Sequence, residues 1–477
     1  MIKKWLSAYT TSYPRSIVYM LQASEYKILV YIKWYRHIKN FHTVEIRKHF
    51  VKTKKSILLL FVAWIINLCI YVFAFSILFS TFWGIKYFLS FAVILAAPYV
   101  LAYGIVIPLL VIKLAVQSPI RYFIIKSAQK KLKKHKAIKI GIAGSFGKTT
   151  MREILKMVLM EGKKVSAPPA NHNTLLGISN FIKNLKGDEE ILIFELGEYY
   201  KGDIREMCEL VNPTMGVITG INEAHLEKFK NLHETMSTVF ELSDWLSGES
   251  VYINGENTLA KENALKNHTV YTRHGLGKWK VEDPHSDLAG TSFTVVNENK
   301  KFECKSKLLG LHQIGPLVVA IDIATSVGIP IEKIQKGVEN TKPFEHRLEP
   351  KIDTHGVVTI DDSYNGNPDG AKVVIEFLAS LRGHRRFYIT PGLVEMGSRT
   401  EVVHREIGKN LAQAHIEKVV LIRNSVTQYI EDGLKEFNYK GDILWFEDGL
   451  KAFAALPHLT VDGDVVLLQN DWPDQYY

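Results

Sequence analysis

The chain has 477 residues, enough for about three ordinary domains, with 59 Lys and Arg against 49 Asp and Glu. The charge is uneven: residues 1–139 carry 22 basic and 2 acidic side chains, and residues 140–477 carry 37 and 47. A composition of 47% hydrophobic and 23% charged residues excludes a disordered chain, and three scattered cysteines exclude a disulfide-built secreted module. The sequence therefore predicts a strongly basic N-terminal part joined to an acidic globular part in a reducing compartment.

Two long uncharged stretches follow the first 55 residues. Residues 56–85 give 30 successive uncharged residues and residues 87–112 give 26, with only Lys86 between them. A membrane span needs roughly 20 predominantly apolar residues, so each stretch is long enough. Buried core helices are seldom this long and free of charge, and a cleaved signal peptide begins nearer the N-terminus. We therefore predict two transmembrane helices, forming a hairpin, over residues 56–112.

The basic flanks predict the orientation of this hairpin. Residues 1–55 carry 12 Lys and Arg, and residues 113–139 carry nine with no acidic residue. Because flanks rich in Lys and Arg stay in the cytoplasm, we expect a multi-pass protein of the cell (inner) membrane with both termini cytoplasmic. Residues 1–55 are then a basic cytoplasmic or interfacial segment, and residues 113–136 a basic linker. The run 130–139 is either a solvated linker or a second lipid-facing patch.

Residues 26–41 are expected to form a helix on the membrane surface. Their apolar side chains recur at helical spacing, with basic residues elsewhere on the helix. The apolar residues are Ile28, Tyr31, Ile32, Tyr35 and Ile38. Nucleic-acid binding through basic and aromatic side chains is the rival interpretation, and the hairpin 15 residues downstream disfavours it. We therefore expect membrane lipid, and no nucleic acid, as the partner of this segment.

A pattern of strand, glycine-rich loop and helix begins at residue 137. Residues 137–144 are typical of a short apolar strand, GSFGKTT follows, and residues 151–162 have apolar side chains at helical spacing. This context predicts a phosphate-binding loop, although its spacing differs from the common G-x-x-x-x-G-K-[ST], and a Gly-Lys-Thr turn also occurs by chance. Lys148 supplies a cation for the outer phosphates, and the Thr149 hydroxyl can ligate magnesium. The predicted nucleotide-binding residues of the loop are Gly144, Ser145, Phe146, Gly147, Lys148, Thr149 and Thr150.

The two apolar strands that follow the loop end in polar residues. One ends in Glu195, and the other runs out into Asn222, Glu223 and His225. Ligands of open α/β sheets bind outside the carboxyl ends of the strands. Each residue alone is better explained as a helix cap or a satisfied loop residue, but their joint occurrence behind a phosphate-binding loop predicts a divalent-cation site. Its predicted ligands are Thr149, Glu195 and His225.

Several motifs together resemble the ATP-dependent Mur ligases of peptidoglycan synthesis, most of all the branch that adds D-alanyl-D-alanine to a UDP-linked muramoyl tripeptide. They keep the family's order over residues 137–470, about 70% of the chain, and DDSYN-x-NP is specific to this branch. The matching segments are GSFGKTT (144–150), NHNT (171–174), ELGEYYKGDI (195–204), NEAHLEKF (222–229), LLGLHQ (308–313), HRLE (346–349), DDSYNGNPDG (361–370), GLVEMG (392–397) and HREIG (404–408).

The resemblance implies an α/β fold with a P-loop central ATP-binding domain at residues 137–345 and a C-terminal Rossmann-like α/β domain at residues 346–477, after the α-helical hairpin. It implies ATP and Mg²⁺ as cofactors. ATP would phosphorylate the carboxylate of an envelope precursor to an acyl phosphate, which the amine of an amino acid or dipeptide then attacks. The chain would thus be a membrane-anchored amide ligase of peptidoglycan precursor synthesis.

The resemblance also implies the roles of individual residues. Phosphoryl transfer depends on positioning and charge neutralisation, which agrees with a Lys, an Arg and metal ions in these roles. The implied catalytic residues are Lys148, Glu195, His225 and Arg347. Gln313, Arg347 and Asp362 would join the loop in binding the nucleotide. The implied substrate-binding residues are Asn171, Asn173, Thr174, Asn365 and Glu395.

Four departures from the family pattern bear on specificity. The apolar hairpin stands where the family has a UDP-binding N-terminal domain. Val239 occupies the position of the family's carbamylated lysine, and Glu241 could replace that ligand only on a rotated helix. The family usually contacts the base of ATP through two amide side chains. At these two positions this chain has Gln313, which keeps an amide, and Pro316, which has none. The usual K-G-S-R near the end is replaced by LLQNDWPDQYY at residues 467–477.

Two other hypotheses remain beside the envelope-precursor ligase. The first is a Mur-type ligase acting on a different carboxylate, such as a polyglutamate-like polymer, which the altered tail would permit. The second is a degenerate ATP-binding scaffold on the membrane, for which Val239 and Pro316 argue. Phosphate release that requires both an acceptor and an amine separates a ligase from a scaffold.

Overall fold

The structure is a computed structural model of the 477-residue chain. It describes residues 2–470 apart from 25, 46–48, 80–83, 170–171, 199, 223–231, 299, 365 and 395, and apart from the side chain of Val116. The chain forms two compact units, Met1–Phe123 and Ile124–Tyr477.

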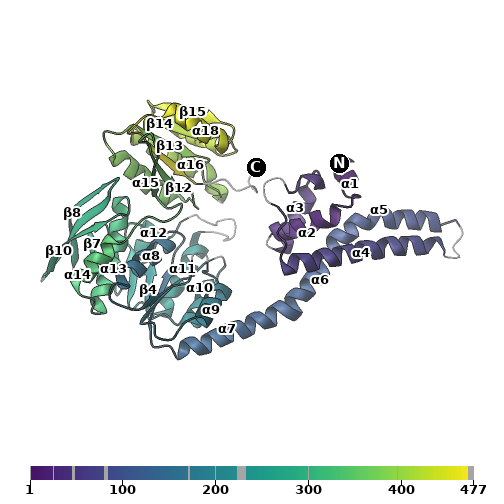
Figure 1. Ribbon diagram of the computed structural model, residues 1–477, viewed down its shortest axis with the longest axis horizontal. Helices are drawn as coiled ribbons and strands as arrows, with labels where there is room; N and C mark the ends of the chain where they lie inside the picture. Colours follow the sequence, from purple (N-terminus) through teal and green to yellow (C-terminus); the bar gives the residue numbers. More distant parts are fainter. Residues whose placement is uncertain are drawn as a thin grey trace. The chain divides into compact units, whose positions relative to one another are not determined.

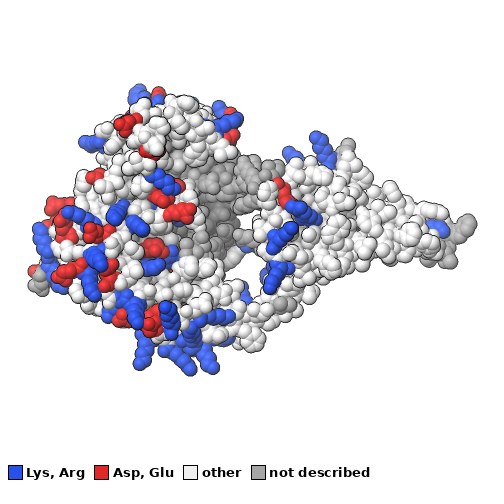
Figure 2. Space-filling view, in the orientation of Figure 1, with Lys and Arg blue, Asp and Glu red and all other residues white. Residues whose placement is uncertain are grey.

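The first unit is helical (Figure 1). Helix α4 (Lys54–Leu78) begins at a capping box in which the hydroxyl groups of Thr53 and Ser56 accept hydrogen bonds from each other's backbone N–H at 3.1 and 2.8 Å. This helix and the continuous helix Lys86–Lys133 are, by length and composition, able to cross a membrane, with hydropathies of 2.6 and 2.3. Figure 2 shows few charged side chains over α4 and its neighbour α5 (Lys86–Gly104). The other elements are α1 (Ile2–Ser7), α2 (Tyr13–Ala23), α3 (Ile28–His37), η1 (Phe41–Thr43), α6 (Val106–Val111), η2 (Ile112–Gln117) and α7 (Ser118–Lys133).

The apolar face of α3 packs against protein. Tyr31 and Tyr35 are buried in a core that also contains Leu101 of α5, and the Tyr31 hydroxyl donates a hydrogen bond to the carbonyl oxygen of Ala102 at 2.8 Å. The structure therefore corrects the expectation that this face lies on lipid headgroups. The reason is that α2 and α3 cover the hairpin helices, and the helical spacing that suits a membrane surface suits a protein core equally well.

The second unit contains two sheets. The larger one has the strand order β10-β9-β8-β7-β6-β5-β4-β1-β3-β2, parallel from β2 to β6 and antiparallel from β7 to β10. Its strands are β1 (Ile138–Ala143), β2 (Val165–Ser166), β3 (Ile191–Glu195), β4 (Met215–Ile218), β5 (Val251–Asn254), β6 (Thr269–Thr272), β7 (Gly275–Leu276), β8 (Trp279–Asp287), β9 (Gly290–Asn297) and β10 (Lys300–Ser306). The parallel strands are nearly continuous apolar runs because helices cover both of their faces.

Successive residues of β3 show how the two faces are covered. Ile193 belongs to one core with Leu155 of α8 and with α13 and α14, whereas Phe194 belongs to a second core with Met207 of α10 and with α11. Side chains alternate across a strand, so one buried strand supplies both cores. The helices are α8 (Lys148–Leu159), α9 (Leu175–Lys183), α10 (Asp203–Val211), α11 (Leu232–Trp245), α12 (Thr258–Glu262), η3 (Leu311–Gln313), α13 (Ile314–Ser326) and α14 (Ile331–Glu339).

The smaller sheet follows in the C-terminal part of the chain, with the strand order β11-β12-β16-β13-β14-β15. Five of its strands are parallel, and β11 pairs antiparallel at one edge. Its strands are β11 (Glu349–Ile352), β12 (Val358–Asp362), β13 (Arg386–Thr390), β14 (Lys418–Ile422), β15 (Asp442–Phe446) and β16 (Val465–Gln469). The helices are α15 (Pro368–Ser380), η4 (Gly397–Arg399), α16 (Thr400–Gln413), α17 (Thr427–Glu436) and α18 (Gly449–Leu459).

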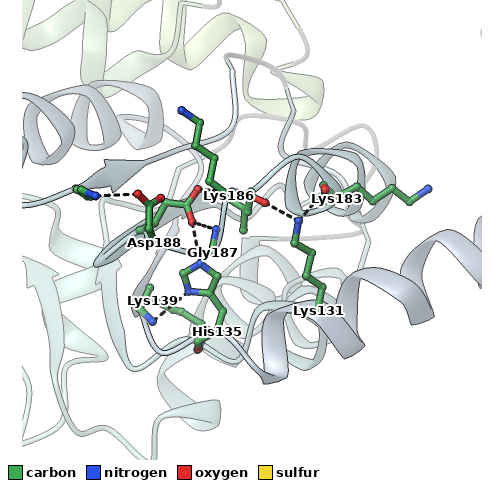
Figure 3. Close-up of polar contacts among 11 residues, drawn as sticks. Lys131, His135, Lys139, Lys183, Lys186, Gly187 and Asp188 are labelled. Carbon is green, nitrogen blue, oxygen red and sulfur yellow. Dashed lines mark hydrogen bonds and ion pairs between the residues drawn. The ribbon is translucent and has the colours of Figure 1, made fainter.

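The end of the basic run 130–139 is part of the second unit (Figure 3). Lys131 donates from Nζ to the carbonyl oxygens of Lys183 and Leu185 at 2.8 and 2.6 Å, and so caps the C-terminal end of α9. His135 Nε2 lies 2.9 Å from a carboxylate oxygen of Glu189. These contacts attach the end of α7 to the segment that joins α9 and β3. Lys130, Lys133, Lys134 and Lys136 of the same run are exposed.

Candidate active site

The predicted phosphate-binding loop lies between β1 and α8. Gly144 has φ 140°, and a Cβ atom there would collide with the Thr219 hydroxyl group at the end of β4. Gly147 has φ 75° and is the N-cap of α8, a left-handed conformation that glycine adopts without strain. The Ser145 N–H donates to the carbonyl oxygen of Gly220 at 2.8 Å. The loop is therefore held against the end of β4, with the N-terminus of α8 behind it.

Glu195, the last residue of β3, lies beside the start of α8. The Thr149 hydroxyl donates to Glu195 Oε2 at 3.1 Å, and Arg152 Nη1 lies 2.7 Å from Glu195 Oε1. β1 and β3 are adjacent parallel strands, and Ile142 is paired with Glu195, so the carboxylate reaches the loop at the shared carboxyl edge. Two of the predicted residues, Thr149 and Glu195, are thus brought together. Arg152 was missed, and its position one helical turn after Lys148 was the available signal.

Lys148 forms an ion pair with Glu198, a carboxylate that the sequence analysis did not predict as part of the site. Its Nζ lies 3.0 and 2.9 Å from the two carboxylate oxygens of Glu198, and it also donates to the Gly144 carbonyl oxygen. The Glu198 side chain is only 1% exposed. Glu198 follows Glu195 by three residues, so the chain leaving β3 carries both carboxylates to the loop.

Four predicted residues lie outside the described part of the chain: Asn171, His225, Asn365 and Glu395. Their neighbours Asn173 and Thr174 are described. The Asn173 carbonyl oxygen accepts a hydrogen bond at 3.0 Å from the N–H of Gly197, which follows Glu195 by two residues. Asn173 therefore lies beside the chain that leaves β3. The Thr174 hydroxyl accepts from the Gly177 N–H at 3.2 Å and caps α9. Thr174 therefore has a structural role at this position.

A cavity of about 310 Å³ joins the loop to the C-terminal part of the second unit. Gly147 and Thr150 line it from the loop, and Arg347 and Asp362 line it from the C-terminal part. The Arg347 guanidinium lies 4.9 Å from the centre of the Tyr364 ring. Burial raises the pKa of Asp362 to about 7, although Arg347 acts to lower it.

Arg347 is largely buried in this cavity, close to acidic side chains. Burial lowers the pKa of Arg347, while the negative charges of Asp362 and Glu195 oppose this shift. An arginine that lines the same cavity as a phosphate-binding loop is positioned to neutralise a polyanion.

The predicted base-binding residue Gln313 lies in the same cavity. Its amide Nε2 is 2.9 Å from Nε2 of His312, and burial lowers the pKa of His312 to about 4, with Arg273 adding to the shift. His312 is thus neutral near pH 7, and its Nε2 can accept the hydrogen bond from the amide. Because this contact uses the side-chain Nε2 of Gln313, its side-chain oxygen Oε1 can accept a hydrogen bond from a ligand. Pro316 lines the cavity as well, without an amide side chain.

The two residues at the predicted position of a modified lysine have other environments. Val239 is fully buried in an apolar core, in keeping with its side chain. Glu241 accepts hydrogen bonds from the backbone N–H groups of Gly202 and Arg205, both at 2.9 Å, and so caps α10. Both of its carboxylate oxygens are engaged, so Glu241 does not replace a metal ligand here.

The residues at the loop fit a hard divalent cation. Among the described residues there is no group of three or more His, Cys, Asp and Glu that could hold a metal ion. However, Mg²⁺ usually binds through one or two carboxylates together with phosphate oxygens and water, and Thr149, Glu195 and Glu198 offer oxygen donors. The Ser145 hydroxyl is buried with no hydrogen-bond partner among the described residues. A site with carboxylates, a hydroxyl and an unpaired buried donor fits a Mg²⁺–nucleotide complex.

A phosphate-binding loop on a parallel sheet, facing a cavity shared with a second α/β region, defines a two-domain nucleotide-dependent enzyme. The family profile of the Mur ligase middle domain matches residues 142–324, and that of the Mur ligase, glutamate ligase domain matches residues 346–469. The chain belongs to the Mur ligase family.

Similar proteins agree with this assignment. UDP-N-acetylmuramoyl-tripeptide–D-alanyl-D-alanine ligase of Bacillus subtilis is 26% identical over 333 residues, which cover 69% of this chain and 72% of that enzyme. The Escherichia coli ligase of the same name is 25% identical over 297 residues, 59% of this chain and 64% of the relative. The MurF ligase from Thermotoga maritima in complex with ADP has a similar fold, with a TM-score of 0.64, 23% identity, and coverage of 74% and 80% of the two chains.

Membership of the family confirms the predicted class of enzyme. The fold is that of the Mur ligases, with an ATP-binding middle domain and a C-terminal α/β domain. The chain is an ATP- and Mg²⁺-dependent ligase of the MurF-like type, which forms carbon–nitrogen bonds in peptidoglycan precursor synthesis. The predictions of ligase activity, ATP and Mg²⁺ are thus confirmed.

Proposed function

We propose that this ligase is anchored in the cytoplasmic membrane and joins an amino acid or dipeptide amine to the carboxylate of an envelope precursor at the cytoplasmic face. The observation that carries the proposal is the placement of Arg347, which lines the same cavity as Gly147 of the loop and Asp362 of the C-terminal part. A carboxylate bound in this cavity would lie between the loop and the C-terminal region, where ATP can phosphorylate it.

The residues of the site have distinct proposed tasks. Lys148 and Arg347 neutralise the transferred phosphoryl group as one precursor carboxylate oxygen attacks the terminal phosphorus and ADP leaves. Bound Mg²⁺ would be held by Thr149, Glu195 and His225, and it supplies charge neutralisation to the phosphates. The attacking amine then forms the amide bond and loses a proton, while phosphate leaves the acyl carbon.

The remaining assignments are proposals of the same kind. The central domain spans residues 137–345 and the C-terminal domain residues 346–477. The nucleotide contacts Gln313 and Asp362 in addition to the loop, and the acceptor or amine contacts the residues of the NHNT, DDSYNGNP and GLVEMG segments. These proposed substrate contacts are Asn171, Asn173, Thr174, Asn365 and Glu395.

The membrane part of the proposal is supported by composition. The apolar stretches 56–85 and 87–112 lie in the two helices that could cross a membrane. Residues rich in Lys and Arg flank the two stretches, and only Lys86 lies between them. Anchoring would keep the ligase at the surface where lipid-linked envelope precursors are assembled, so the proposed partners include membrane lipid. The relatives' names specify a UDP-linked muramoyl tripeptide and D-alanyl-D-alanine, and we propose the same chemical classes for this chain: a peptidyl carboxylate and a short amine.

The test uses the full chain in detergent. Purified protein is incubated with ATP, Mg²⁺ and D-alanyl-D-alanine, together with either a UDP-linked or a lipid-linked muramoyl tripeptide, and product masses and phosphate release are measured. We expect one phosphate released per amide bond, and only when both acceptor and amine are present. ATP hydrolysis whose rate does not change when acceptor and amine are added would overturn the proposal. So would the absence of product with both the UDP-linked and the lipid-linked acceptor.

A further inference from the structure

Lys148, the cation of the phosphate-binding loop, is paired with the buried carboxylate of Glu198. Lys148 is the loop's cation, yet both oxygens of the Glu198 carboxylate lie within 3.0 Å of its Nζ. The Glu198 side chain is 1% exposed and that of Lys148 is 14% exposed. A carboxylate so deeply buried needs a compensating positive charge at all times.

Nucleotide binding changes this balance. The phosphates bring several negative charges to Lys148, and its ammonium group can neutralise them only by sharing its charge between them and Glu198. Two anionic groups that compete for one lysine within a buried site repel each other strongly. A divalent cation that accompanies the phosphates would relieve this repulsion, because carboxylate and phosphate oxygens are its preferred ligands.

The other carboxylates considered for the site have partners besides Lys148. Glu195 is already compensated by Arg152, which lies 2.7 Å from it. Glu241 uses both of its oxygens to cap α10, and Val239 is an apolar residue of the core. Among the described residues at the loop, Glu198 is therefore the carboxylate whose negative charge is compensated by Lys148 alone.

We propose that Glu198 is a ligand of the divalent cation that enters with ATP, and that it exchanges Lys148 for this cation when the nucleotide binds. The proposal rests on the proposed ATP site and adds a residue to it. Lys148 is thereby released toward the phosphates at the moment when the metal arrives. The loop would then bind the metal–nucleotide complex much more tightly than the free nucleotide.

The experiment compares wild-type protein with Glu198→Gln, which keeps the shape of the side chain and removes its charge. Mn²⁺ affinity is measured by electron paramagnetic resonance in the presence of a non-hydrolysable ATP analogue. Affinity for the analogue without metal is measured by calorimetry in EDTA. We expect Glu198→Gln to weaken Mn²⁺ binding by roughly tenfold or more, as disturbed metal sites do. We expect it to leave metal-free nucleotide binding unchanged or tighter, because the repulsion is gone.

A residue that only positions Lys148 would give the opposite pattern: weaker metal-free nucleotide binding with unchanged Mn²⁺ affinity. That result would overturn the proposal. Glu241→Gln is the matched control, since it removes the charge of a half-buried carboxylate that caps α10 and does not contact Lys148, and both affinities should stay at their wild-type values. If the wild-type protein bound no nucleotide under either condition, the proposed ATP site would fail as well, and the two failures are therefore distinguishable.

Discussion

The Arg152 guanidinium lies 2.7 Å from Glu195 Oε1, and each of the two side chains is only 5% exposed. Arg152 comes from the helix that follows the phosphate-binding loop, and Glu195 ends the neighbouring strand β3. The ion pair therefore links the two elements that present the proposed metal ligands. It also means that the Glu195 side chain belongs to the interior of the protein.

Breaking this pair from the arginine side should destabilise the protein. Arg152→Met leaves the Glu195 carboxylate buried without its partner, which typically costs about 3–5 kcal/mol. The measurement is chemical unfolding of the detergent-solubilised chain. Arg405→Met is the control, because the Arg405 side chain is 37% exposed. Ion pairs at the surface contribute about 1 kcal/mol or less to the free energy of unfolding. Equal losses in the two variants would contradict the structural role of the buried pair.

Removing the loop's cation should affect the rate far more than binding of the acceptor. Lys148→Ala takes away a preorganised charge at the transferred phosphoryl group, which costs on the order of 2.7–4 kcal/mol of barrier, or 100- to 1000-fold in kcat. Steady-state phosphate release measures this loss. Lys163→Ala removes a lysine paired with Glu190 at 3.2 Å near the surface and should retain the wild-type rate. A Lys148→Ala enzyme with full activity would remove the basis for the site.

Asp362 should give the folded protein a pH-dependent stability. Its pKa rises from 3.8 to about 7 because burial disfavours the carboxylate. Between these values the folded state keeps a proton that the unfolded state has released, so stability falls as the pH rises through this window and levels off above about pH 7. The asparagine in Asp362→Asn cannot ionise, so this variant does not lose stability through Asp362 as the pH rises. The melting temperature of the variant relative to wild type should therefore increase from pH 4 to pH 7, and parallel curves would refute the assignment.

The topology is tested by reporters. Because Lys and Arg crowd both flanks of the hairpin, a reporter fused after Tyr477 should read as cytoplasmic, and one inserted next to Lys86 should read as external. The two fusions serve as each other's controls. An external C-terminal reporter would place the ligase domains on the wrong side of the membrane for ATP, and the proposed localisation would fall.

Activity should not depend on dissolved carbon dioxide. Val239 is fully buried and apolar, so it can neither form a carbamate nor bind a metal ion. The assay is run in degassed buffer and again after bicarbonate is added, and the rates should agree. Lys228 and Lys230, which lie outside the described residues, are the lysines nearby in sequence. Stimulation by bicarbonate that disappears in Lys228→Arg or Lys230→Arg would show that one of them carries the carbamate instead.

The secondary structure around the loop could be predicted because its signals are local. Glycines at 144 and 147 are required by the backbone angles there, and the apolar run that ends at Glu195 needs helices on both faces. The expected helix at 26–41 was also correct as a helix. Its partner was not, since an apolar stripe at helical spacing does not record whether lipid or protein covers it.

The sequence by itself determined the family and placed Thr149 and Glu195 in one predicted site, because parallel strands end at one edge of the sheet and local patterns specify those strands. Only the tertiary structure decided which charges compensate one another. Arg152, Glu198 and Glu241 are ordinary polar residues in the sequence, and their partners come from other elements. Charge compensation depends on distances of a few ångströms between such elements, and burial decides how much each uncompensated charge costs.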